Sequence, residues 1–222
     1  MKLPQLLSVC IAGLLCAAQA QAQSALSGDL GTTGVGVHLS LPVQGNLNAR
    51  FGVNYLNYSY NSHTTDVDYD FKLKLRTFDA LLDFFPMDGG FRLSAGLVYN
   101  GNKIDAHGKP NSNGSYTING NTYLASTAGT IDGKIDFRKA APYLGIGWGN
   151  PVKQAGWGIS GDLGVLLQGS PSTSLLNTDC TAPAPICTRL AGDVATENAT
   201  LADKAHDFKA YPVLRVGASY RF

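Results

Sequence analysis

The chain has 222 residues, 44% of them hydrophobic, and a formal net charge of +1, which suits one domain of moderate size. It contains no run of basic residues, so we expect no nucleic-acid partner. Glycine (26) and tyrosine (10) are abundant, whereas Glu197 is the only glutamate, and this composition favours strands over helices.

Residues 1–22 have the pattern of a secretory signal peptide. Lys2 precedes an apolar stretch over residues 6–18, and small residues around Ala20 have the spacing of a cleavage site. The stretch is too short to cross a bilayer as a helix, and no later stretch approaches ~20 apolar residues. We therefore expect residues 23–222 to form one mature domain, and any membrane span in it to be made of β-strands.

The first part of this domain alternates apolar and polar residues, as strands with one face in lipid do. Residues 33–41 form the first clear strand, and residues 47–56 follow after a short turn at 42–45. A tyrosine cluster suited to an interfacial aromatic girdle ends the second strand: Tyr55, Tyr58 and Tyr60. A polar loop is expected over residues 61–68.

Residues 69–85 predict a long strand along which the charged residues change from one face to the other. Lys72, Lys74 and Arg76 share one face, but Asp79 and Asp83 lie at the opposite parity. Either a β-bulge near Thr77 shifts the phase, which is the interpretation we prefer here, or the basic end stands outside the bilayer.

Further strands are predicted at residues 91–100, 142–148 and 157–168, joined to their neighbours by short turns at 86–90 and 149–155. Residues 105–132 are rich in Asn, Gly, Ser and Thr. Within them, Asn119-Gly120 predicts a hairpin, which we expect to protrude from the barrel that the strands would form. Residues 169–207 form a long insertion with a short helix expected from Val194 to Ala205. Short and long connections alternate, as in barrels with tight periplasmic turns and long external loops.

Two cysteines remain after the signal peptide, Cys180 and Cys187, both in the long insertion. Export implies an oxidising compartment, so a local disulfide is expected; two unpaired thiols in a loop are the alternative. The segment offers too few further ligands for a metal site.

The last residues, 215–222, alternate to the final Phe222 and predict the closing strand. Tyr220, Phe222 and Val216 face outward in this pattern, and Arg215 and Arg221 face inward. Seven strands are clear. Since single-chain bacterial barrels have an even number, the eighth is assigned to residues 24–32.

Together, the signal peptide, the alternating segments, the aromatic girdles and the terminal Tyr-Arg-Phe resemble small outer-membrane barrels of Gram-negative bacteria, of the OmpA-transmembrane and OmpW type. The resemblance implies an all-β fold: an antiparallel transmembrane barrel of about eight strands with long external loops. It also implies an insertion signal, read by the barrel-assembly machinery, at Arg215, Gly217, Tyr220 and Phe222. The implied location is the bacterial outer membrane.

The inward-facing charges form the candidate site: Arg50, Arg92, Arg215, Arg221, Asp79, Asp83 and Asp162. In a barrel of ~8 strands the interior has room only for side chains, so these charges are expected to pair and plug it. This predicts a structural or surface-interaction role. The alternative is a narrow, porin-like channel or a binding pocket for small apolar molecules.

A lipid-modifying enzyme is the least favoured alternative, because the histidines His38, His63, His107 and His206 have no HExxH or GxSxG context. His38 is interpreted as a lumen filler, and the others as solvated loop residues. No cofactor is expected. Outer-membrane lipid, including lipopolysaccharide, is the expected partner, and the basic set at residues 72–76 is placed to meet its phosphates.

Overall fold

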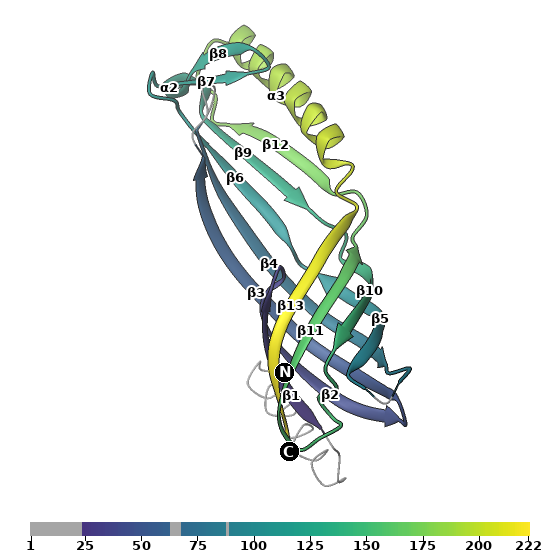
Figure 1. Cartoon of the computed structure of the whole chain (residues 1–222). Coiled ribbons are helices and arrows are strands. Elements are labelled where there is room, and N and C mark those ends of the chain that lie inside the picture. The colour runs from purple at the N-terminus through teal and green to yellow at the C-terminus, as the bar shows by residue number, and fades with distance from the viewer. Residues whose placement is uncertain (1–23, 63–67, 88) are drawn as a thin grey trace, which may run out of the picture.

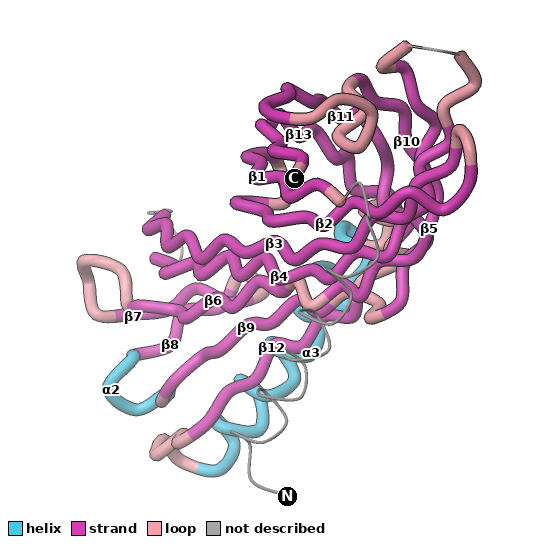
Figure 2. The backbone as a smooth tube through the Cα atoms, turned by 90° about the horizontal axis from the view of Figure 1, so that it is seen from below, coloured by secondary structure: helices cyan, strands magenta, loops and turns pink. Residues whose placement is uncertain are grey.

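A computed structural model describes residues 24–62, 68–87 and 89–222, so the predicted signal peptide and most of the polar loop at 61–68 lie outside the described residues. Eight antiparallel strands close into a barrel (Figure 1), which the view in Figure 2 shows as a ring. In order around the ring they are β1 (Ala25–Gly31), β2 (Gly34–Gln44), β3 (Leu47–Ser62), β4 (Asp68–Phe84), β5 (Phe91–Asn100), β10 (Ala140–Trp148), β11 (Gly156–Leu167) and β13 (Ala210–Arg221).

The N-terminal strand β1 closes the ring and confirms the eighth strand assigned to residues 24–32. It pairs with β2 on one side and with β13 on the other. Ala25 lies opposite Arg221, and Gly31 lies opposite Arg215. The sheet of the barrel therefore has no free edge between its first and last strands, which is the condition for crossing lipid as β-structure.

Alternation along the ring strands places apolar side chains outside and polar ones inside. On β13, for example, Val213, Arg215 and Ser219 are buried while Leu214 and Val216 are exposed. Trp148 and Trp157 flank the short turn at 149–155 and are 63% and 81% exposed, so aromatic side chains lie on the outer surface at this end. The turn expected at 42–45 lies later in the chain. Strand β2 continues to Gln44 with an irregularity after Pro42, and the chain turns at Gly45 and Asn46.

A second sheet region, which we call the extension, continues from the ring beyond its loop end (Figure 1). It consists of the outer halves of β3 and β4 together with β6 (Lys103–Lys109), β9 (Thr130–Asp136) and β12 (Ser172–Thr178). Sequence patterns did not predict these three added strands. They attach because β4 changes partner: Thr77–Phe84 pairs with β5, and Asp68–Lys74 pairs with β6.

The predicted bulge near Thr77 is wrong. Pairing of β3 with β4 runs without interruption from Leu47 opposite Phe84 to Ser62 opposite Tyr69. Such strands of 16 and 17 residues are longer than the ~9–11 residues needed to cross a bilayer. The change of pattern in β4 therefore occurs where the strand leaves the ring and enters the extension, as expected if the basic end stands outside the bilayer.

The predicted hairpin is confirmed as β7 (Ser115–Ile118) and β8 (Asn121–Leu124), at the far end of the extension (Figure 1). Its turn residues Asn119 and Gly120 both have positive φ, as this type of turn requires. The short helix α2 (Ala125–Ala128) follows directly.

Helix α3 (Ala184–Ala205) is longer than the predicted helix at Val194–Ala205. Pro185 lies in its first turn, where a proline needs no hydrogen-bond partner, so the prolines there do not prevent a helix. Leu190 and Val194 pack against Ile131 and Leu175 of the extension. Within the described residues, no helix has the length and apolarity needed to cross a membrane.

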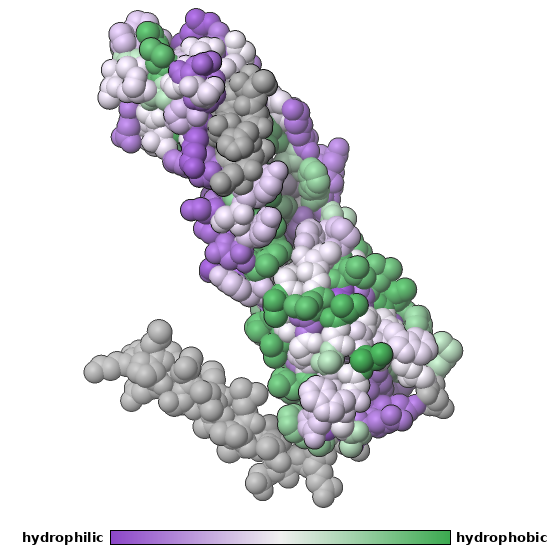
Figure 3. Space-filling model, turned by 60° about the vertical axis from the view of Figure 1, so that its left-hand side comes forward, coloured by the Kyte–Doolittle hydropathy of each residue, from purple (hydrophilic) through white to green (hydrophobic). Residues whose placement is uncertain are grey.

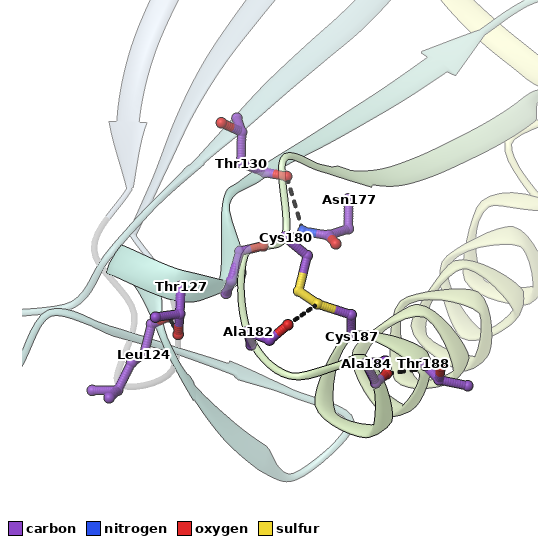
Figure 4. The surroundings of a disulfide bond; sticks show 10 residues. Leu124, Thr127, Thr130, Asn177, Cys180, Ala182, Ala184, Cys187 and Thr188 are labelled. Carbon is purple, nitrogen blue, oxygen red and sulfur yellow. Dashed lines mark hydrogen bonds between the residues drawn. A yellow bond between two sulfur atoms is a disulfide. The ribbon is translucent and has the colours of Figure 1, made fainter.

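Cys180 and Cys187 form a disulfide that joins the segment before α3 to its first turns (Figure 4). Cys180 also packs against the apolar cluster between α3 and the hairpin. The bond lies in the extension, away from the ring, and so fixes the start of α3.

The candidate functional site is a charged lumen

Two clusters of charged side chains fill the barrel interior. The first, the turn-end cluster, contains Arg50, Asp83, Arg92 and Asp162. The second, the histidine cluster, contains Asp29, His38, Asp79 and Arg215. All eight side chains are at most 9% exposed, so each charge depends on its neighbours in the lumen rather than on water.

In the turn-end cluster, the Arg50 guanidinium bridges two carboxylates. Its Nε lies 2.9 Å from Oδ2 of Asp83, and its Nη1 lies 2.8 Å from Oδ2 of Asp162. Arg92 binds the same Asp162 through Nη2 at 2.8 Å and also donates to the carbonyl of Gly149 in the short turn. Ser94 donates to Asp83 at 2.5 Å. Two cations and two carboxylates thus balance in charge, with fork-like geometry that favours pairing.

In the histidine cluster, Asp79 receives three donors. Arg215 Nη2 lies 2.8 Å from its Oδ2, and His38 Nε2 and Asn54 Nδ2 each lie 3.1 Å from the same oxygen. The other ring nitrogen of His38, Nδ1, is 2.6 Å from Oδ2 of Asp29. Both ring nitrogens lie near carboxylates, and Nε2 makes a hydrogen bond to Asp79, so the surroundings of the ring favour the positively charged imidazolium. With that charge, this cluster is also neutral.

Local sequence makes room for these side chains. A Cβ at Gly52, which lies opposite His38 across the strand pair, would overlap the imidazole ring. A Cβ at Gly147 would similarly meet Asp162 and Arg92. These glycines therefore mark positions where a charged side chain from a neighbouring strand crosses the lumen.

Apolar groups close the lumen at both ends of the charged section. At the turn end, Phe85 and Val152 are buried, and Asn48 Nδ2 donates to Asn150 Oδ1 at 3.1 Å. Toward the loop end lies a buried cluster: Leu81, Val98, Ala141, Tyr143, Leu166 and Val213. Between the two charge clusters, a cavity of ≈ 10 Å³ has room for about one water molecule.

The structure brings together Arg50, Arg92, Arg215, Asp79, Asp83 and Asp162, but the placement of Arg221 in the same network is wrong. Arg221 has the inward parity, yet it is the last residue of β13 and lies at the turn end, where it donates to the carbonyl of Lys153. Asp29 was not among the predicted site residues, and His38 was predicted only to fill the lumen. Their parity was visible in the sequence, but their pairing depends on closure of the ring through β1.

The residues of the expected insertion signal all lie on or beside β13. Arg215 is buried in the histidine cluster, and Gly217 lies against the backbone of Gly28. Tyr220 packs edge to face with Trp157 at 5.3 Å between ring centroids. Phe222 is 74% exposed and makes the same kind of contact with Tyr220.

These features define the class of the protein: a closed, eight-stranded antiparallel barrel of the outer-membrane type, with its interior filled by paired charges. No protein-family model matches the chain, and no curated protein matches it.

Solved structures show the same fold. The chain is similar to Acinetobacter baumannii CarO2 with a TM-score of 0.55 and 21% identity, over 90% of this chain and 99% of that one. It is also similar to Acinetobacter baumannii CarO, with a TM-score of 0.52 and 19% identity over 90% and 98% of the two chains. A major outer membrane protein from Thermus thermophilus follows, with a TM-score of 0.48 and 15% identity over 90% and 98%.

Proposed function

We propose that this protein is a surface barrel of the Gram-negative outer membrane whose role is structural or interactive and whose lumen is closed to hydrophilic solutes. The observation that carries the proposal is the pair of neutral charge clusters, held between apolar groups at both ends of the lumen. Moving any of these side chains aside would leave a buried charge without its partner. The closed state is therefore the stable one.

The test is conductance in planar bilayers. Unmodified protein should show no steady current, because paired charges and buried apolar side chains fill its lumen. The double variant Arg50→Ala/Asp162→Ala removes one charge of each sign from the turn-end cluster and should admit small ions. A matched variant, Lys134→Ala/Asp136→Ala, removes a surface ion pair of the extension and should stay silent. Stable single-channel currents from unmodified protein would instead establish a porin-like conduit.

The proposed role is non-enzymatic. Catalysis by serine requires a base within hydrogen-bonding reach, and in the described part of the chain no serine hydroxyl bonds a histidine ring. His38 binds carboxylates on both sides, and the exposed His107 binds Asp132 at 2.6 Å. A lipid hydrolysis assay with unmodified protein would reveal a lipid-modifying activity if one exists.

A pocket for small apolar molecules is the second candidate, and one observation favours it. The inner face of the extension, continuous with the lumen side, carries a row of paired apolar residues: Tyr58, Leu73, Ile104 and Ile135. Helix α3 packs on this face over β9 and β12. Saturable binding of an apolar fluorescent probe, lost in Ile104→Asp but retained in Asp105→Asn on the opposite face, would establish this pocket.

A further inference from the structure

Exposed and half-buried cations gather where the barrel meets the extension. We call this set the basic belt; its members are Lys72, Lys74, Arg76, Lys103, Lys134, Arg138, Lys139 and Lys209. The carboxylates at the same height are Asp105 and Asp136 on the extension and Asp207 beside Lys209. The belt therefore carries a clear excess of positive charge, although the whole chain has a net charge of only +1.

The belt lies directly beyond an aromatic ring on the outer surface of the barrel. Tyr55, Phe78 and Tyr99 of this ring are 52%, 48% and 59% exposed. Arg76 follows at once, with its guanidinium 5.4 Å from the centre of the Tyr55 ring. Lys139 accepts a backbone hydrogen bond from Asn100, the neighbour of Tyr99. Since such aromatic side chains occupy the headgroup level, the belt lies where lipid headgroups would be.

On the extension, the sign of the outer-face charges changes with distance from the barrel. In the rows nearest the barrel, Lys74 lies opposite Lys103 on the neighbouring strand. In the next of these rows, Lys72 lies opposite Asp105, and Asp105 lies opposite Lys134. Farther out, the next row contains Asp70, His107 and Asp132. Partial burial alone would raise the pKa of Asp105, but its hydrogen bond from Lys74 and the nearby charge of Lys103 lower it, so it stays ionised. Even so, cations outnumber it in these rows.

Several belt cations have no carboxylate partner among the described residues: Lys72, Arg76, Arg138, Lys139 and Lys209. Outside the lumen, the opposite, short-turn end of the barrel has only Lys153 and Arg221 among its described cations. Long connections leave from the belt end, which in barrels of this type is the external side. We propose that the basic belt binds the phosphate groups of the glycolipid in the outer leaflet, lipopolysaccharide.

The proposal can be tested with purified protein in neutral detergent and two probes, bisphosphorylated lipid A and the same lipid with its phosphates removed. Native mass spectrometry would measure how much of each lipid stays bound. Unmodified protein should retain the phosphorylated lipid preferentially, and added salt should weaken this binding. Equal retention of both lipids would overturn the proposal.

A triple variant, Lys72→Gln/Arg76→Gln/Lys139→Gln, removes belt cations without leaving a carboxylate unpaired. Each cation near an anionic surface contributes about a five-fold change in affinity, so we expect about 100-fold weaker binding of phosphorylated lipid A. The control, Lys109→Gln/Arg189→Gln/Lys204→Gln, removes as many cations from β6 and α3, outside the belt, and should bind within about two-fold of the unmodified protein. Equal loss in both variants would show that net charge, not the belt, is responsible.

Migration on gels before and after heating would verify that each variant retains the closed barrel. If the triple variant fails to fold, Lys72→Gln alone should still weaken binding about five-fold. The result is independent of the closed lumen, because conductance of the unmodified protein is measured without lipid A. A conducting barrel could still have a functional belt, and a silent one could lack it.

Discussion

The barrel and the extension arrange polarity in opposite ways, although β3 and β4 run through both. In the barrel half of β4, Asp79 and Asp83 face the lumen, and Phe78 and Leu82 face outward. In the extension half, Leu73 and Leu75 take the inner face, and Lys72 the outer one. Figure 3 shows the result on one side of the molecule: hydrophobic side chains gather over the barrel and hydrophilic ones over the extension.

The pairing of β3 with β4 is regular, so no backbone irregularity accounts for the change of pattern. If the ring lies in lipid, as we propose, its lumen is the only place for charge, whereas the extension in water can carry charge outside and keep its inner face for apolar packing. The energetic consequences also differ. Breaking a charge pair in the lumen lowers the free energy of unfolding strongly, whereas a surface pair such as Lys109 and Asp70 contributes little to it.

The largest expected effect comes from the closing strand. Phe222→Asp places a charge at the end of β13, where the resemblance to outer-membrane barrels puts the signal read by the assembly machinery. We expect the variant to accumulate in the periplasm or be degraded, which fractionation and blotting would measure. Phe208→Asp, an exposed aromatic just before β13, is the control and should assemble. Normal outer-membrane levels of the Phe222 variant would contradict this role.

Within the assembled barrel, Asp162→Ala should be the most damaging lumen substitution. Asp162 binds both Arg50 and Arg92, so its loss leaves two buried guanidinium groups short of a partner. We expect a loss of about 3–5 kcal/mol in the free energy of unfolding, measured by urea titration in detergent. Asp136→Ala, which breaks the exposed pair with Lys134, should cost less than about 1 kcal/mol. Equal costs would mean that the lumen is hydrated.

Two substitutions on the outer face of β4 compare its barrel half with its extension half directly, and their expected effects on stability are smaller. Leu82→Lys puts a charge on the lipid face of the ring and should cost about 2 kcal/mol of unfolding free energy. Lys72→Leu, an opposite change on the same face ten residues earlier, should change it by less than about 0.5 kcal/mol, because that position faces water. The same urea titration measures both. Similar costs for the two would place the extension half of β4 in lipid as well.

Sequence patterns predicted the ring well because each membrane strand needs one lipid-facing side. The period-2 apolar residues, the Asn119-Gly120 hairpin and even the short N-terminal strand follow from that requirement or from turn chemistry. The added strands β6 and β9 were missed because their segments are short and rich in charged and small residues. A signal was nevertheless present, since Ile104 alternates with Lys103 and Asp105, as expected of a strand with one face in water.

The lumen network could be predicted only in part. Parity identifies which residues face inward, and most of the paired charges follow from it. Parity cannot show that Asp29 meets His38, because this contact forms across β1 and β2 only in the correct register. Nor does it give height along the axis, which separates Arg221 at the turn end from Arg215 in the interior.

The smallest expected effect is a local, pH-dependent loosening of the extension. Asp193 of α3 accepts hydrogen bonds from Tyr123, and from Asn119 at 3.0 Å and Asn121 at 2.8 Å, which together tie the helix to the hairpin. The hydrogen bond from Tyr123, followed by that from Asn119, lowers the pKa of Asp193. A lowered pKa in the folded state means that this stabilisation is complete above the ordinary aspartate value of about 3.9 and is lost as the pH falls further.

Protection of the β7 and β8 amides against hydrogen exchange, relative to their intrinsic rates at the same pH, should therefore fall below about pH 4 while protection of the ring strands stays high. Asp193→Asn should show fast hairpin exchange already at neutral pH and lose most of the pH dependence, because it can no longer become a carboxylate. Asp203→Asn, an exposed position on the same helix, is the matched control and should behave like the unmodified protein. If the ring strands lost protection together with the hairpin, the barrel and the extension would unfold as one cooperative unit. They would then differ only in how they arrange polar and apolar side chains.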